Sequence, residues 1–161
     1  MDRLRPHTNT PGHKALRYGR YSEPHRLYLV TTATFQRQPF FDNWQIGRIV
    51  IGEMKRVSDE EELVESKAWV LMPNHLHWLF ALTDKTDLAN VMRLVKGRSA
   101  HNINERLIRK GPVWDKAFHE HALRKDEDVI NVARYIVANP LRAGLVKRTA
   151  DYPLWDAIWV E

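Results

Sequence analysis

The strongest constraint on the fold is an apolar stretch, residues 63–82, that a single Pro-Asn pair divides into two halves. Both halves are rich in β-branched, aromatic and other apolar residues, which favour extended structure. The dividing pair, Pro73-Asn74, suits a tight turn. The stretch therefore predicts a β-hairpin.

The second half of this hairpin places two histidines on one side of a strand. Alternate side chains point to opposite faces, and one face is uniformly apolar and must meet the core. That apolar set is Leu76, Trp78, Phe80 and Leu82. His75 and His77 then point away from the core, roughly 7 Å apart along the strand. Two imidazoles so placed can hold one ion, although a lone His-x-His is more often a pair of surface histidines.

A second pair competes with the first. His119 and His121 also fall on one side of an expected extended segment, with Glu120 opposite. Spacing alone does not choose between the two pairs as metal ligands.

The rest of the chain alternates strands and helices. The expected elements are a strand at 26–35, a helix from Asp42 or Asn43 to 57, a helix at 86–110 broken at Gly97, an extended segment at 113–124 and a helix at 126–140. A hairpin mixed with long helices predicts an α+β fold, with a single antiparallel sheet and helices packed on it. A Rossmann-type fold is excluded because no glycine-rich turn joins a strand to a helix.

Composition limits the class of protein. The 161 residues suit one domain at 25–161, preceded by a basic, proline- and glycine-broken arm at 1–24. Cysteine is absent, which removes disulfides, thiolate chemistry and cysteine-based zinc sites. No apolar run approaches the roughly 18 residues of a membrane span, and no secretory signal is visible. A formal charge of +5 favours polyanionic partners such as nucleic acid, since phosphates pair with Lys and Arg.

The last expected helix carries a tyrosine and an asparagine four residues apart. Tyr135 and Asn139 are therefore neighbours beside the apolar stripe of that helix, where a side chain can reach toward a sheet and stay accessible. Two structural explanations remain open. Tyr135 can be an ordinary residue at the edge of the core, and Asn139 can cap a new helix whose first residue is Pro140.

Four segments together resemble a known family. "MPNHLHWLF", "LVKGRSAHNIN", "VWDKAFHEHALR" and "ARYIVANPLRAGLV", in this order and spacing, resemble the REP-associated tyrosine transposases, single-tyrosine members of the HUH superfamily. The similarity runs from about Tyr28 to Val146. It implies the ferredoxin-like HUH nuclease fold, with His75 and His77 as the metal-binding histidines, Tyr135 as the nucleophile and Asn139 as the polar residue that completes the metal site.

The resemblance also implies a reaction and a cofactor. Imidazole ligands alone suit zinc, iron or nickel, whereas the family implies Mg²⁺ or Mn²⁺. The implied activity is nicking and strand transfer of single-stranded DNA beside repetitive extragenic palindrome (REP) hairpins, through a 5′-phosphotyrosine. The expected location is the bacterial cytoplasm, at the nucleoid, and either a monomer or a homodimer is compatible with the sequence.

Further residues are candidates for contact with DNA. They are Arg17, Arg20, Lys96, Arg98 and Arg142 for phosphates, Trp114 as a stacking platform, and His121 and Arg124 as contacts to DNA or to the metal ligands. Two alternative functions remain: a hairpin-binding protein or repressor without turnover, and a metal phosphodiesterase in which Tyr135 is structural.

Overall fold

The computed structural model describes residues 22–159, and a β-hairpin lies at its centre. Strands β2 (Val64–Met72) and β3 (His75–Leu82) are antiparallel and meet at the Pro73-Asn74 turn. The predicted hairpin is confirmed, including its turn.

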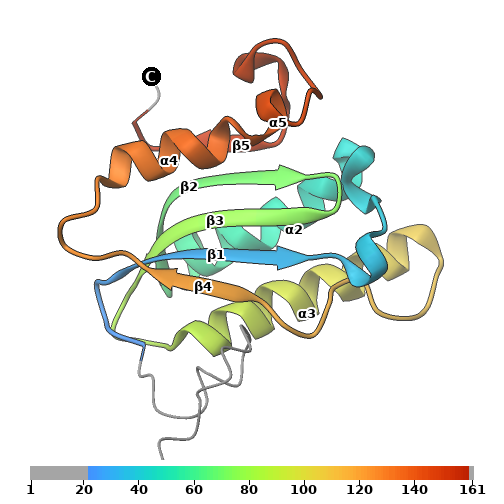
Figure 1. Ribbon diagram of the computed structural model, residues 1–161. Coiled ribbons are helices and arrows are strands. Elements are labelled where there is room, and N and C mark those ends of the chain that lie inside the picture. The colour runs from blue at the N-terminus through green and yellow to red at the C-terminus, as the bar shows by residue number, and fades with distance from the viewer. Residues whose placement is uncertain (1–21, 160–161) are drawn as a thin grey trace, which may run out of the picture.

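Three further strands complete one antiparallel sheet (Figure 1). β1 (Leu27–Ala33) pairs with β3, β4 (His119–Ala122) pairs with β1, and β5 (Trp155–Ala157) pairs with β2. The order across the sheet is β4-β1-β3-β2-β5. The prediction of an α+β fold with one antiparallel sheet is confirmed, whereas the short edge strand β5 was not predicted.

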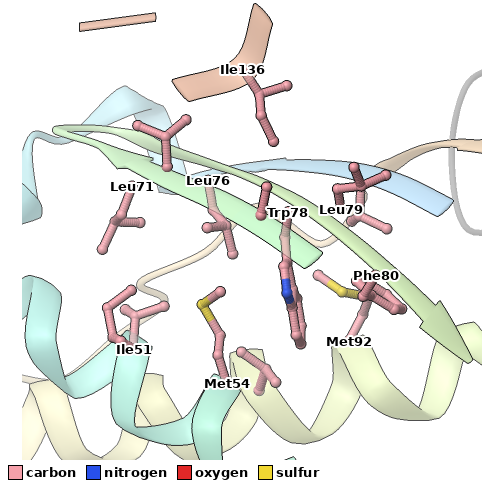
Figure 2. Packing of buried hydrophobic residues seen from close by; sticks show 14 of the residues in the cluster. Ile51, Met54, Leu71, Leu76, Trp78, Leu79, Phe80, Met92 and Ile136 are labelled. Carbon is pink, nitrogen blue, oxygen red and sulfur yellow. The ribbon is translucent and has the colours of Figure 1, made fainter. Parts of the chain in front are cut away.

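Two long helices cover one face of the sheet (Figures 1 and 2). α2 (Trp44–Lys55) starts at Asn43, whose side chain accepts a hydrogen bond from the Gln45 amide, and α3 is Leu88–Leu107. Against them β3 presents the four residues expected to face the core, each at most 1 % exposed: Leu76, Trp78, Phe80 and Leu82. Figure 2 shows Met54 and Met92 on the same side of the strands as the Trp78 indole.

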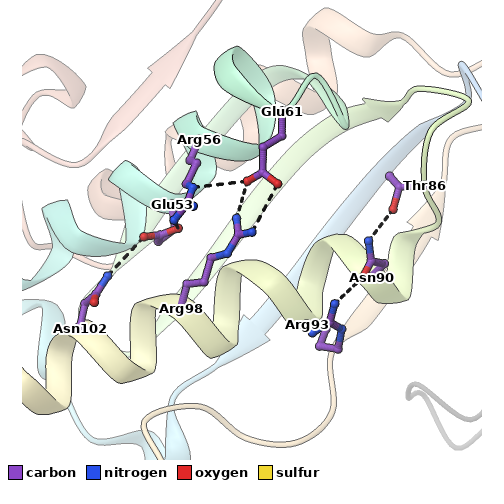
Figure 3. Close-up of polar contacts among 8 residues, drawn as sticks. All are labelled: Glu53, Arg56, Glu61, Thr86, Asn90, Arg93, Arg98 and Asn102. Carbon is purple, nitrogen blue, oxygen red and sulfur yellow. Dashed lines mark hydrogen bonds and ion pairs between the residues drawn. The ribbon is translucent and has the colours of Figure 1, made fainter.

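Polar contacts join these two helices at their edges (Figure 3). Glu61, which follows the π-turn Arg56–Glu60 at the end of α2, forms a paired hydrogen bond with Arg98 of α3. Asn102 of α3 donates to Glu53 of α2 at 3.3 Å. These contacts fix the two helices against each other above the apolar layer.

α3 differs from its prediction. The helix runs without interruption through Gly97, so the predicted break there is wrong. Buried residues on both sides of the glycine, Val95 and Ser99 among them, hold the backbone helical. Tertiary packing on both sides thus outweighs the low helix propensity of one glycine.

The other face of the sheet carries the C-terminal helices α4 (Val129–Val137) and α5 (Asn139–Arg142). α4 contacts β2 and β5, and it buries Ala133 and Ile136. Figure 2 shows Ile136 across the strands from Trp78 and Met54. The sheet therefore has helices on both faces, and the histidine face is covered in part.

Short helical turns complete the described chain, at Phe35–Arg37, Phe40–Asp42 and Thr149–Asp151. Within residues 22–159, no helix combines the length and the apolar character needed to cross a membrane. The predicted basic arm lies almost wholly outside the described residues.

Candidate active site

The histidines of β3 lie on the face of the sheet that α4 covers. His77 is opposite Thr31 of β1, and His75 is opposite Ala33. The two imidazole rings are 4.8 Å apart between centroids and stand at 89° to each other. The rings are therefore closer together than the spacing of alternate residues along a strand, which is roughly 7 Å. Both histidines are half-buried. The two rings are near enough to contribute to one ion.

A hydrogen bond to Nδ1 orients each imidazole. His75 Nδ1 donates to the Asn74 side-chain oxygen at 2.7 Å. His77 Nδ1 lies 2.8 Å from the Thr31 hydroxyl, which can accept from it. In these tautomers the Nε2 atom of both rings carries a free lone pair. Such contacts are the usual way in which a protein fixes the orientation of a histidine ligand.

Both histidines favour the neutral form that a metal ligand needs. Burial lowers the pKa of His77 to about 4, with smaller contributions from the nearby charges of His75 and Arg142. Burial also lowers the pKa of His75, helped by the positive charge of Arg37. A neutral imidazole does not have to lose a proton before it binds a cation.

The candidate nucleophile lies on α4 and is accessible. The Tyr135 side chain is 66 % exposed, on the flank of the helix whose apolar side packs on the sheet. The guanidinium of Arg142, on α5, lies 3.9 Å from the centre of the Tyr135 ring. This cation–π contact holds the tyrosine in place without burying its hydroxyl.

Asn139 is joined to the same arginine. Arg142 donates to the Asn139 side-chain oxygen at 2.9 Å, and the Asn139 side-chain nitrogen donates to the Ile136 carbonyl at 3.0 Å. Asn139 is the first residue of α5 and its side chain does not cap that helix, so the alternative of a purely capping role is wrong. Arg142 thus contacts Tyr135 and Asn139 directly, and its charge acts on His77.

The donors available here suit a divalent cation. Within residues 22–159, no group of three or more His, Cys, Asp or Glu side chains is arranged to hold an ion. A third protein ligand would then be a neutral oxygen. The sequence predicted the Asn139 amide oxygen, which here accepts from Arg142. Two imidazoles and one amide would leave positions open for phosphate oxygens and water, as a catalytic site requires.

The competing pair lies on the exposed edge strand β4. His121 Nε2 is 2.9 Å from a Glu127 carboxylate oxygen, so this nitrogen already has a partner. His119 pairs with Thr31 of β1, which on its other edge pairs with His77 of β3, so two strand spacings separate the two histidines. His119 and His121 are therefore weaker candidates for metal ligands than His75 and His77.

The candidate phosphate contacts of α3 are engaged by protein groups. The Lys96 ammonium donates to the carbonyls of Asp115 at 2.6 Å and Ala117 at 3.3 Å, and burial lowers its pKa to about 8. Arg98 is paired with Glu61. Both residues belong to the helix layer on the far side of the sheet from His77, and their roles in DNA binding stay predictions.

Trp114 cannot serve as an exposed stacking platform. The residue is only 6 % exposed, its ring packs 5.3 Å from that of Phe41 between centroids, and its indole nitrogen donates to the Ser99 hydroxyl at 3.0 Å. The prediction failed because sequence does not show that a bridge from Trp114 to Thr34 draws this segment into the core.

The remaining candidates are not gathered at the histidine pair. Arg124 lies 3.6 Å from Asp126 and 3.7 Å from Glu127, in the loop after β4, and Glu127 also contacts His121. Arg17 and Arg20 lie outside the described residues.

Comparison with known proteins places the chain. The profile of the family described as "Transposase IS200 like" matches residues 25–139. The chain belongs to the IS200-like transposase family. It is 31% identical to the REP-associated tyrosine transposase of Escherichia coli strain K12 over 128 residues, which cover 79% of this chain and 72% of the relative.

A solved structure agrees with the family assignment. This IS200-like transposase superimposes with a TM-score of 0.69 and 27% identity on a REP-associated tyrosine transposase bound to a REP hairpin, over 86% of this chain and 80% of the other. The predicted resemblance and the predicted enzyme class are confirmed: the chain is a tyrosine transposase, an enzyme that nicks and transfers DNA strands.

The sequence did not predict the roles that three residues have at this site. Thr31 and Asn74 orient the histidines, and Arg142 connects the tyrosine helix to the histidine face. The only signal for Asn74 was its position beside His75, and nothing in the sequence linked Thr31 to a residue 46 positions later.

Proposed function

We propose that this transposase is a metal-dependent endonuclease and strand transferase for single-stranded DNA, acting beside REP hairpins through a 5′-phosphotyrosine at Tyr135. One observation carries the proposal: a single guanidinium, that of Arg142, contacts Tyr135 and Asn139 and acts electrostatically on His77. The hairpin bound to the structural relative supports the choice of substrate.

Tyr135 is the group that attacks. Its oxygen forms a bond to the scissile phosphorus, the bond from phosphorus to the leaving 3′-oxygen breaks, and the phenolic proton passes to solvent. The leaving oxygen takes up a proton and becomes a free 3′-OH. Attack by the 3′-OH of another strand reverses the step and releases Tyr135, so strand transfer needs no ATP.

His75, His77 and Asn139 would hold the divalent cation, Mg²⁺ or Mn²⁺. When bound, the cation polarises the phosphate and stabilises the leaving oxygen. The Asn139 oxygen accepts from Arg142 here, and its second lone pair would be available to the ion. Arg142 stays beside Tyr135, where its charge can meet a phosphate oxygen and orient the strand for attack.

The test is a nicking assay on a single strand that carries a REP hairpin, with Mg²⁺ or Mn²⁺. His77→Ala should abolish nicking and lower the affinity for Mn²⁺ in calorimetry, because one of two imidazole ligands is lost. His119→Ala is the matched control, and it should nick the strand and bind Mn²⁺ as the parent protein does. The opposite ranking would move the metal site to β4.

The same assay addresses the non-catalytic alternative. If the parent protein binds the hairpin but leaves the strand intact with either metal, the chain acts as a hairpin-binding protein. The complete set of His75, His77, Asn139 and Tyr135 argues against that outcome, since binding alone needs neither a nucleophile nor two oriented imidazoles.

A further inference from the structure

A groove lined by three tryptophans runs along the β5 edge of the sheet. It lies between α2 and the strands β2 and β5, with a volume of about 520 Å³, and its aromatic lining is Trp44, Trp69 and Trp155. Trp44, the first residue of α2, is 47 % exposed, and the other two are partly exposed. Exposed aromatic residues that are scattered singly over a surface are common and need no explanation. Three solvent-accessible tryptophans in one groove instead form a continuous aromatic surface, which is typical of a ligand-binding site.

Two cations accompany these rings. Arg48 and Lys55 line the groove from α2, and the Arg48 guanidinium lies 5.7 Å from the centre of the Trp44 ring. A smaller hollow of about 190 Å³ continues the groove along Lys55 and Trp69 and adds one charge of each sign, Lys67 and Asp59. Among the described residues that line the larger groove, Asp156 is the only acid against Arg48 and Lys55, so this lining carries a net positive charge.

A glycine lines the groove on its α2 side. Gly52 lies inside α2, one turn from Arg48, and a Cβ atom built there would meet no atom within 4 Å. Glycine destabilises a helix interior relative to alanine, and the space around Gly52 would admit a Cβ atom. Only a larger side chain at this position would enter the groove.

The groove opens at the β5 edge of the sheet, and one of its residues shares a row of the sheet with His77. Trp155 pairs with Val70, and Val70 pairs with His77, so all three belong to one row that crosses the strands. Two strand spacings separate Trp155 from His77, or roughly 10 Å. α4, which carries Tyr135, contacts both β2 and β5. α2 and Trp69 lie on the opposite face of the sheet from His77, because Trp69 pairs with Trp78. A single strand that leaves the groove would therefore pass round the β5 edge to reach the face that carries α4.

We propose that this groove binds single-stranded DNA at the β5 edge of the sheet, outside the cleavage site. Bases stack on Trp44, Trp69 and Trp155, and Arg48 and Lys55 neutralise phosphates. Indole faces and cations in one groove are the combination that binds single strands with little regard to sequence. A duplex does not fit this chemistry, because its bases are already stacked on one another. The choice of DNA rests on the proposed function, but the binding does not require cleavage.

The experiment uses full-length protein with Tyr135→Phe, so that no strand is cut or attached. The probe is an oligothymidine of about ten nucleotides without a hairpin, a length within the range that one such groove binds. Binding is followed by fluorescence anisotropy of a labelled strand and by quenching of tryptophan emission. Trp44→Ala should weaken binding about tenfold, the loss expected for one stacked base. Arg48→Gln should reduce the slope of log affinity against log salt concentration by about the amount that one neutralised phosphate contributes.

Substitutions at Gly52 separate groove filling from loss of fold. Gly52→Leu should weaken binding as much as Trp44→Ala, because its side chain enters the groove, while the melting temperature stays at or above that of the parent. Gly52→Ala adds only a methyl group and should bind nearly as the parent does. Lys125→Gln removes an exposed cation at the opposite edge, beyond β4, and should leave binding unchanged.

Several results would overturn the inference. The first is parental affinity for the oligothymidine in both Trp44→Ala and Gly52→Leu. The second is equal affinity of the protein for a duplex of the same length. The third is self-association in sedimentation that Gly52→Leu abolishes, which would make the groove an interface between copies of the chain. The two proposals can fail separately. If the parent protein does not nick DNA but Trp44→Ala and Gly52→Leu bind the oligothymidine more weakly, the proposed function is wrong and the groove proposal is supported. If the parent protein nicks DNA but both variants bind the oligothymidine normally, only the groove proposal is wrong.

Discussion

At the residue scale, the candidate site depends on contacts that are far apart in the sequence. The His75–His77 pair could be predicted from alternation along a strand, but its orientation could not. Thr31 reaches His77 only because β1 pairs with β3 in one particular register. The choice of His75 and His77 over His119 and His121 also came from family resemblance, and the Glu127 contact that occupies His121 was invisible in the spacing.

The Thr31 contact gives a prediction with a neighbouring control. Thr31→Val removes the hydroxyl that accepts from His77 Nδ1, so the ring loses its fixed tautomer. Affinity for Mn²⁺ should fall on the order of tenfold in calorimetry, in the range found for partners that orient metal ligands. The fold should persist, since valine fills nearly the same volume in a strand.

Thr32→Val makes the same change one residue away. The Thr32 hydroxyl is buried on the opposite face and has no hydrogen-bond partner among residues 22–159. This variant should keep parental Mn²⁺ affinity and should be equally or more stable, because it removes an unsatisfied buried polar group. Equal metal affinity in Thr31→Val and the parent would show that the Thr31 contact does not orient a ligand.

At the element scale, sequence patterns predicted most helices and strands and failed where packing decides. The hairpin, β1, the α2 start and the apolar side of α4 follow from periodicity and capping, and they are confirmed. β5 escaped prediction because three residues carry no periodic signal, and it is anchored by Tyr152, whose hydroxyl donates to the buried Leu71 carbonyl. The false break at Gly97 treated helix propensity as stronger than the core contacts on both sides.

Two glycines in helices test that explanation with the same substitution. Gly97→Ala should raise the free energy of unfolding by about 1 kcal/mol in urea denaturation, because a Cβ atom there meets nothing within 4 Å and alanine favours the helix. Gly47→Ala, in α2, should instead destabilise the protein, because the new Cβ would lie 2.6 Å from Leu154 Cδ1. A lower stability of Gly97→Ala would mean that α3 needs a flexible residue at this point.

At the scale of the whole molecule, the sheet separates two tasks. α2 and α3 form the main core on one face, and the half-buried histidine face is left for α4 and α5, which bring Tyr135 and Arg142 from far along the chain (Figure 1). Sequence predicted helices on a sheet, but not that they lie on both faces. Division of the helices between two faces depends on the order of the strands, and periodicity within single elements does not fix that order.

The central claim is that Tyr135 becomes covalently attached to DNA. The most direct measurement is to incubate the protein with Mn²⁺ and a hairpin-bearing single strand, denature it, digest DNA and protein, and locate the remaining nucleotide by mass spectrometry. Cleavage after Arg134 and Arg142 releases residues 135–142, in which Tyr135 is the only tyrosine. We expect a 5′-linked nucleotide on this peptide, and none in Tyr135→Phe. A nucleotide on any other residue, or cleavage of the strand by Tyr135→Phe at the parental rate, would contradict the account.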